Sequence, residues 1–205
     1  TPGPSALTFW LGAHGKSARL ADAQAALGCM GAVTVCDNFI GARWSKLLIN
    51  SAFSGLSAAT GQTFGEIAGN KASRRVAQRI MKECIDVAKA SGVRVEPVQG
   101  HRIDRLLDYK GPLKRALSFR LIPVAMKKHA GLVSGMLRDL QNGRRCEIDF
   151  ICGAVCRSAG ACGVPAPFNA RTVEIVHGIE EGKYAVSPSN IALYADLFGG
   201  KRKQS

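Results

Sequence analysis

The chain has 205 residues, of which 46% are hydrophobic, and its formal net charge is +13. No apolar run approaches the roughly 20 residues of a membrane-spanning helix, which argues against a membrane protein. Lys and Arg are spread along the whole sequence without interleaved aromatic residues, so the charge favours a small anionic ligand over a nucleic-acid partner.

Residues 1–37 predict a strand, a helix and a second strand. The strands are expected at residues 7–11 and 32–36, and an Ala-rich helix at residues 17–27 with Ser17 as its cap. The unit is too small to fold alone, and the sequence begins without Met or a signal-peptide pattern. We therefore expect it to be the end of an α/β domain in a longer chain. No G-x-G-x-x-G motif follows a strand, so no dinucleotide cradle is predicted here.

A central helix of about six turns is predicted over residues 37–61. Asp37 or Asn38 can cap its start, and Gly61 can end it. Most of its circumference is apolar, which is typical of a helix at the centre of a domain. One line of side chains at spacings of three or four stays polar: Arg43, Lys46, Asn50, Ser54 and Ser57.

Two interpretations of this polar line are open. Lys46 could reach water along apolar surface while Asn50 bonds a neighbouring loop, as in many amphipathic helices. Alternatively the line faces a cleft, because burying a lysine and an asparagine without partners costs about 2–7 kcal/mol for each unpaired polar group. An anionic ligand in such a cleft would supply the missing partner.

From residue 38 onward the sequence predicts helices only. Caps, prolines and apolar periodicity place them at residues 64–68, 72–90, 103–107, 112–128, 134–140, 144–162, 168–182 and 188–198. Pro123 is expected to kink or divide one helix, and Ser134 to cap another. Glu147 and Asp149 fall in the opening turns of the helix at 144–162, where complementarity to the helix dipole could account for them. Residues 199–205 are expected to form a basic tail.

The seven cysteines form neither a CxxC pair nor the spacing of a secreted disulfide framework. Small apolar residues surround the four that cluster near the C-terminal end, so we interpret them as core thiols and predict no metal site. Reduced thiols also predict a cytoplasmic protein. The clustered cysteines are Cys146, Cys152, Cys156 and Cys162.

Three segments resemble signatures of the ketopantoate reductase (2-dehydropantoate 2-reductase) family. Residues 44–50, WSKLLIN, are similar to its W-x-K-L-x-x-N helix. Residues 134–139, SGMLRD, and 144–150, RRCEIDF, are similar to its S-S-M-x-x-D and R-x-x-E-I-[DE]-[YF] signature. Residues 163–167, GVPAP, resemble its G-[VI]-x-x-P turn. The order and separations match over essentially the whole chain.

The resemblance implies an NADPH-dependent enzyme of two domains that reduces the 2-oxo acid ketopantoate in pantothenate biosynthesis. Residues 1–37 would be the last part of its Rossmann domain. Residues 38–198 would form a helical domain with the 6-phosphogluconate dehydrogenase C-terminal-like fold. NADPH would be bound mainly upstream of this chain, so no cofactor-binding residue is expected here, and the chain alone is expected to be inactive. A homodimer is a further expectation.

The resemblance also implies roles for individual residues. Lys46 would be the general acid that protonates the alkoxide as hydride reaches the carbonyl carbon. Asn50 would hold the substrate or the lysine, and Glu147 would accept a hydrogen bond from a substrate hydroxyl. Ser134 would bind the carboxylate. Ser54, at a position where the family commonly has asparagine, is the remaining candidate for substrate binding.

Three positions depart from the family pattern. Gly135 replaces the second serine, which the family uses on the carboxylate, while Phe64 and Leu132 stand where polar residues are expected. These changes imply a more apolar pocket, so one alternative is a family member acting on a different 2-oxo acid. The non-catalytic alternatives are a helical dimerisation module and, on charge alone, a nucleic-acid binder.

Overall fold

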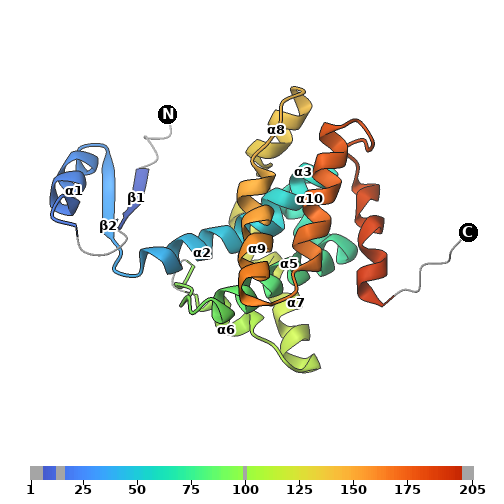
Figure 1. Ribbon diagram of the computed structural model, residues 1–205, viewed down its shortest axis with the longest axis horizontal. Coiled ribbons are helices and arrows are strands. Elements are labelled where there is room, and N and C mark those ends of the chain that lie inside the picture. The colour runs from blue at the N-terminus through green and yellow to red at the C-terminus, as the bar shows by residue number, and fades with distance from the viewer. Residues whose placement is uncertain (1–6, 13–16, 99–100, 200–205) are drawn as a thin grey trace, which may run out of the picture.

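The chain folds into a small strand-helix-strand unit followed by a helical bundle. The computed structural model describes residues 7–12, 17–98 and 101–199. The small unit lies at one end of the long axis, and helix α2 (Phe39–Ile49) runs from it into the bundle (Figure 1). The mainly helical architecture predicted from the sequence is confirmed, while the basic residues of the tail lie outside the described residues.

The N-terminal unit contains two parallel strands. Strand β1 (Leu7–Leu11) pairs with β2 (Gly31–Val35), with Leu7 opposite Gly31, and α1 (Leu20–Gly28) makes the crossover. The predicted order is therefore confirmed. The predicted helix start was wrong by three residues, because a turn precedes Leu20 and the Ser17 carbonyl, not its side chain, accepts the Leu20 N–H at 3.3 Å.

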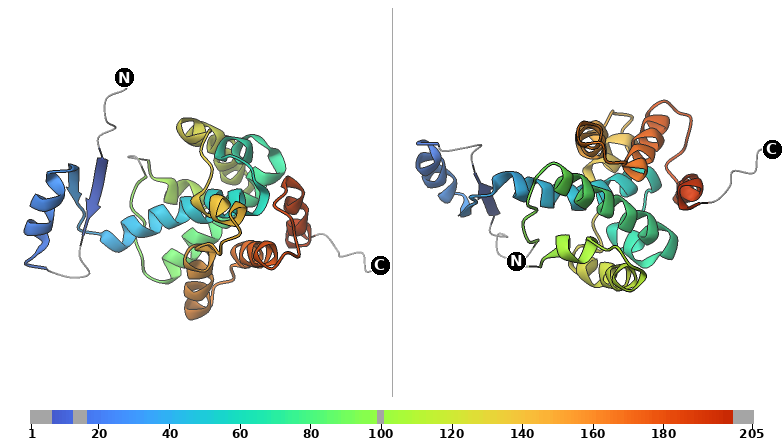
Figure 2. Two further views of the ribbon diagram at one scale, coloured as in Figure 1. Left: turned by 90° about the horizontal axis from the view of Figure 1, so that it is seen from above. Right: turned by 60° about the horizontal axis from the view of Figure 1, so that its bottom comes forward.

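The predicted central helix is present as one continuous helical segment. It comprises α2, a π-helical turn η1 (Asn50–Ser54) and α3 (Gly55–Thr60), and it passes through the bundle (Figure 2). The Asn38 side chain caps its start by accepting the Gly41 N–H at 3.2 Å. Gly61 ends it with φ of 74°, a conformation that glycine adopts without a steric cost.

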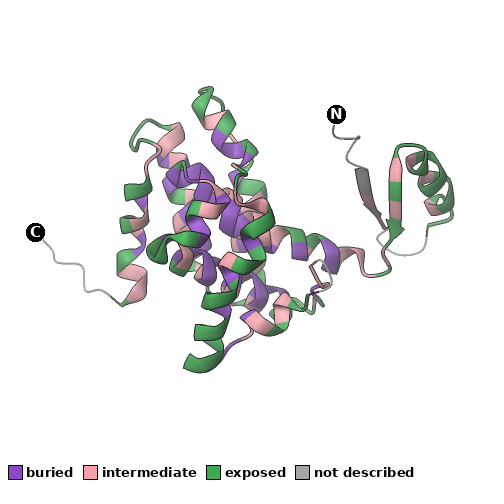
Figure 3. Cartoon of the chain, turned by 180° about the vertical axis from the view of Figure 1, so that it is seen from behind, coloured by how far each residue is buried: buried purple, intermediate pink, exposed green. Residues whose placement is uncertain are grey.

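The remaining helices surround this central segment, and the buried residues concentrate where they meet (Figure 3). They are α4 (Phe64–Gly69), α5 (Lys71–Ala90), α6 (Ile103–Leu107), α7 (Pro112–Met126), α8 (Gly135–Gln141), α9 (Ile148–Cys162) and α10 (Pro167–Glu180), with 3-10 helices η2 (Lys127–His129) and η3 (Pro188–Phe198). Among the described residues, no helix combines the length and apolarity needed to cross a bilayer.

Helix α9 begins at Ile148, four residues later than predicted. The preceding N–H groups are bound elsewhere: Arg144 donates to the Asp139 carbonyl at 2.9 Å, and Cys146 donates to the Glu180 carboxylate at 2.9 Å. These contacts hold residues 144–146 out of the helix. As a result, Glu147 lies at the N-cap of α9 instead of inside its first turns.

The prediction of core thiols is confirmed for Cys152, which is fully buried, while Cys146, Cys156 and Cys162 are only half-buried. Cys152 lies near a second buried thiol, Cys84, whose Sγ is 3.0 Å from the Ser51 hydroxyl. Within the described residues, no group of three or more His, Cys, Asp or Glu side chains is arranged to hold a metal ion.

The buried thiols should be chemically inert in the native chain. Burial raises the pKa of Cys84 to about 12, so at neutral pH almost none of it is the reactive thiolate. Iodoacetamide should therefore label exposed Cys29 quickly, and Cys84 and Cys152 only after denaturant is added, as peptide mass spectrometry can measure. Equal labelling of Cys29 and Cys84 in the native chain would contradict this packing.

Candidate active site

A cavity of about 990 Å³ lies between α2 and α9. Helix α2 and the start of η1 form one wall, α9 forms the other, and Pro97 and Val98 contribute from the segment that follows α5. Most lining side chains are apolar. The polar side chains at its surface are Arg43, Ser45, Lys46, Asn50, Glu147 and Ser158.

Helix α2 and the first residue of η1 place Lys46 and Asn50 on the cavity wall. They are four residues apart, and Arg43 precedes Lys46 by three, so the three side chains share one face. Lys46 and Arg43 are exposed, whereas Asn50 is half-buried. Of the two interpretations of the polar line, the cleft fits Arg43, Lys46 and Asn50, because all three side chains line this open cavity.

Glu147 lines the same cavity from α9. Its position at the N-cap of a helix of 15 residues places it where the positive end of the helix dipole favours negative charge. The exposed ring of Phe150 lines the cavity one turn further along α9. The cavity thus has two cations on one wall and one carboxylate on the other, an arrangement suited to a ligand with an anionic group and a hydrogen-bond donor.

The predicted polar line does not continue past Asn50 along the cavity. Neither Ser54 nor Ser57 lines it. The π-helical turn over residues 50–54 accommodates one extra residue, which rotates the following side chains by about 100° relative to an uninterrupted α-helix. Ser57 is fully buried, as is every other residue of α3. Turns of this π-helical kind occur frequently at functional sites.

Ser134 also lies outside the cavity lining. Its hydroxyl accepts the Leu137 N–H at 3.0 Å and caps α8 as predicted, while its own N–H donates to the Ser57 hydroxyl at 3.2 Å. Both serines are buried, so this contact ties α8 to the central helix. The structure therefore brings Lys46, Asn50 and Glu147 together, and leaves Ser54 and Ser134 away from the lining.

The positions that depart from the family pattern also lie away from this cavity. The ring of Phe64 is buried and packs on Phe53 with ring centroids 5.6 Å apart. The Phe64 N–H donates to the Leu132 carbonyl at 2.9 Å, and Gly135 opens α8. These residues therefore leave the lining of the described cavity unchanged.

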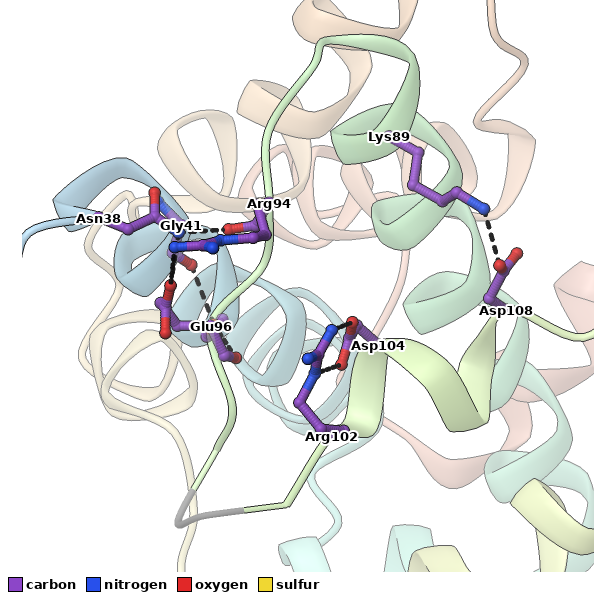
Figure 4. A network of polar contacts seen from close by, with 9 residues as sticks. Asn38, Gly41, Lys89, Arg94, Glu96, Arg102, Asp104 and Asp108 are labelled. Carbon is purple, nitrogen blue, oxygen red and sulfur yellow. Dashed lines mark hydrogen bonds and ion pairs between the residues drawn. The ribbon is translucent and has the colours of Figure 1, made fainter.

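The segment that contributes Pro97 is fixed to the start of α2 by side chains that sequence reasoning missed. Asn38 donates from Nδ2 to the Arg94 carbonyl at 2.7 Å and to the Glu96 carboxylate at 2.6 Å (Figure 4). The Ser45 hydroxyl donates to the Glu96 carbonyl at 2.6 Å. The only sequence signal for this contact was a glycine one turn before a serine in α2.

That glycine, Gly41, is required by the close approach of the two segments. A Cβ atom there would lie 2.0 Å from the Arg94 carbonyl oxygen and 2.3 Å from Asn38 Nδ2. Gly41→Ala should therefore lower the free energy of unfolding by about 1–3 kcal/mol, as measured by urea denaturation. Gly160→Ala is the matched control, because a Cβ there meets nothing within 4 Å, and it should stabilise by about 0.5–1 kcal/mol. Similar effects for both variants would contradict the contact.

A family model described as "Ketopantoate reductase PanE/ApbA C terminal" matches residues 38–180. The chain belongs to the ketopantoate reductase family. A 2-dehydropantoate 2-reductase from Pyrococcus horikoshii is 26% identical over 137 residues, which cover 66% of this chain and 38% of that protein. One from Escherichia coli O157:H7 is 30% identical over 135 residues, covering 65% of this chain and 37% of that protein. The chain thus spans well under half the length of these relatives.

Solved structures of a ketopantoate reductase and of a second dehydrogenase share the fold. A PanE/ApbA family ketopantoate reductase from Ralstonia eutropha JMP134 has a TM-score of 0.63 and 29% identity, over 83% of this chain and 53% of that chain. A D-mandelate dehydrogenase, solved with NADH and anilino(oxo)acetate, has a TM-score of 0.67 and 18% identity, over 85% of this chain and 53% of that chain. This second likeness shows the fold alone.

The described residues do not fit a complete dinucleotide site. A pyrophosphate cradle of the Rossmann type needs a glycine-rich turn between a strand and a helix N-terminus. The sequence contains no G-x-G, and the connection between β1 and α1 falls partly outside the described residues. The described residues of this chain instead form a cavity whose walls carry cationic, amide and carboxylate groups.

Proposed function

We propose that this chain is the substrate-binding and proton-donating part of an NADPH-dependent reductase that converts a 2-oxo acid, ketopantoate first among them, to the 2-hydroxy acid. The observation that carries the proposal is the presence of Lys46, Asn50 and Glu147 on the walls of one cavity. Family membership supports the reaction class. The substrate, cofactor and pantothenate pathway are part of the proposal.

Lys46 is proposed as the general acid. A reduced nicotinamide cofactor would supply the hydride, and the carbonyl oxygen of the substrate would gain negative charge as the hydride arrives. The Lys46 ammonium stabilises that charge and gives the oxygen a proton. Its place on the cavity wall, one turn before Asn50, supports this role.

The other polar groups of the cavity would orient the substrate. Asn50 has an amide that can donate to the oxo or carboxylate oxygen, and Glu147 can accept from a hydroxyl group. Ser54 and Ser134 stay predicted substrate contacts. The Ser134 hydroxyl caps α8 in this structure, so a direct contact with the substrate would need it to accept a second partner.

The test is an activity panel on the complete product of the gene that encodes this chain. NADPH and NADH oxidation should be followed with ketopantoate, phenylglyoxylate and short aliphatic 2-oxo acids. Oxidation that depends on ketopantoate supports the proposal as stated. Oxidation with other 2-oxo acids only would keep the chemistry and change the substrate, and phenylglyoxylate is included because the cavity walls are largely apolar. No oxidation with any acid would overturn the proposal.

The non-catalytic alternative, a helical dimerisation module, makes a different prediction. One structural neighbour is the dimeric ketopantoate reductase from Staphylococcus aureus, at 15% identity and a TM-score of 0.64. A tight dimer without nucleotide binding or activity would favour that alternative. A homodimer with activity would agree with the proposal.

A further inference from the structure

Helix α7 carries an apolar face that the bundle leaves uncovered. Leu113 is 87% exposed, Val124 69% and Leu117 51%. The opposite side of the helix packs on the bundle through the buried Ile122 and Met126. Spacings of four, four and three residues align the exposed side chains over about 16 Å of one helix face. They are Leu113, Leu117, Leu121 and Val124.

The stretch of sequence that contains this apolar face carries positive charge and no negative charge. Residues 110–138 contain no Asp or Glu. The lysines and arginines of this stretch are all exposed, and none forms an ion pair with a described carboxylate. Those on or next to α7 are Lys110, Lys114, Arg115, Arg120, Lys127 and Lys128, whereas Arg138 belongs to α8 on the upper side of the bundle (Figure 1).

The shape of the region is convex. Helix α7 projects from the lower side of the bundle in Figure 1, and its projecting part is coloured as exposed in Figure 3. An exposed apolar patch of this kind marks an interaction surface. This ridge has apolar side chains along its length, with cations beside it and at both ends. Such a surface fits a flat partner that is anionic and partly apolar. It fits less well a partner that inserts into a groove.

We propose that α7 lies on an anionic phospholipid surface. Leu113, Leu117 and Val124 would enter the headgroup boundary, while the neighbouring cations contact lipid phosphates. A second copy of this chain fits less well, because it would bring the same positive charges against these cations. The inference is independent of the proposed catalytic role, since no residue of this surface lines the cavity.

The test is sedimentation of the full chain with vesicles of phosphatidylglycerol and phosphatidylcholine, and with vesicles of phosphatidylcholine alone. The variant Leu113→Ser/Val124→Ser removes apolar surface without changing net charge. The matched control is Met30→Ser, at a 62% exposed methionine outside α7. Far-UV circular dichroism checks that all the chains are folded, and light scattering reports their oligomeric state without lipid.

The expected result is binding to the anionic vesicles, little binding to phosphatidylcholine, and a partition coefficient lowered about tenfold or more in the double variant. Met30→Ser should stay within about twofold of the unchanged chain, since it removes apolar surface elsewhere. Equal binding of both variants would mean that bulk charge alone attracts the chain, and would overturn the proposal. Absence of binding to the anionic vesicles would also overturn the proposal. So would light scattering that shows a dimer of the unchanged chain and a monomer of the double variant, because the face would then bind a second copy.

Discussion

Lys46→Ala in the complete gene product should lower kcat for the 2-oxo acid by about 100- to 10,000-fold, the range that a positioned general acid contributes. The side chain is exposed on the cavity wall, so its removal should leave the fold intact. Steady-state NADPH oxidation measures the effect. Lys71→Ala, at an exposed lysine outside the cavity, is the matched control and should keep the full rate.

Lys46→Arg separates charge from proton donation. Arginine keeps the positive charge but holds its proton too tightly to act as a general acid near neutral pH. We therefore expect KM to change little while kcat stays low. A rate near that of the unchanged enzyme in either Lys46 variant would remove this residue from the proton-transfer step.

Glu83→Ala should produce the largest loss of stability of the substitutions considered. The buried carboxylate of Glu83, on α5, accepts the N–H groups of Phe168 and Asn169 at 2.9 Å each, and the Asn169 side-chain amide at 2.7 Å. It thereby caps the start of α10 from a distant part of the chain. Removal leaves two buried backbone N–H groups without partners and leaves the Asn169 amide with the Ile80 carbonyl, at 3.4 Å, in place of its shorter contact. Together with the cavity that forms, this should cost about 3 kcal/mol or more.

Urea denaturation of the full chain measures this loss. Glu174→Ala, at an exposed carboxylate on α10 that pairs with Arg171 at 2.9 Å, is the matched control and should change stability by less than about 1 kcal/mol. Equal stability of the two variants would show that Glu83 does not cap α10.

Glu83 should also make the free energy of unfolding depend on pH. Desolvation raises the pKa of Glu83 above its usual value, although the three donors act in the opposite direction. The folded chain therefore binds this proton more tightly than the unfolded chain, and the contribution to stability falls as pH rises through the folded-state pKa. The difference in unfolding free energy between the unchanged chain and Glu83→Gln should shift in that direction, and a constant difference would contradict it.

Local signals predicted most of the fold. Asn38 and Gly61 bound the central helix in the sequence and also in the structure, because a side-chain cap and a left-handed glycine act on their own neighbours. Ser134 caps α8 for the same reason. The face formed by Arg43, Lys46 and Asn50 was likewise predictable, since it depends only on helical spacing.

Features set by tertiary packing escaped prediction. The π-helical turn at residues 50–54 has no local sequence signature, and the serines of the predicted polar line within and after it, Ser54 and Ser57, lie outside the cavity lining. The start of α9 is set by contacts with Asp139 and Glu180 that no periodicity reveals. Contacts between residues far apart in the sequence, such as Glu83 with Asn169, could not be predicted from the sequence and are known only from the structure.

The most direct test of the central claim is a crystal structure of the complete gene product with NADP⁺ and a 2-oxo acid bound. We expect the acid in the cavity between α2 and α9, with its oxo oxygen about 3 Å from Lys46 Nζ. Asn50 and Glu147 should contact its other polar groups. An acid bound outside this cavity, or an oxo oxygen that faces away from Lys46, would contradict the assignment.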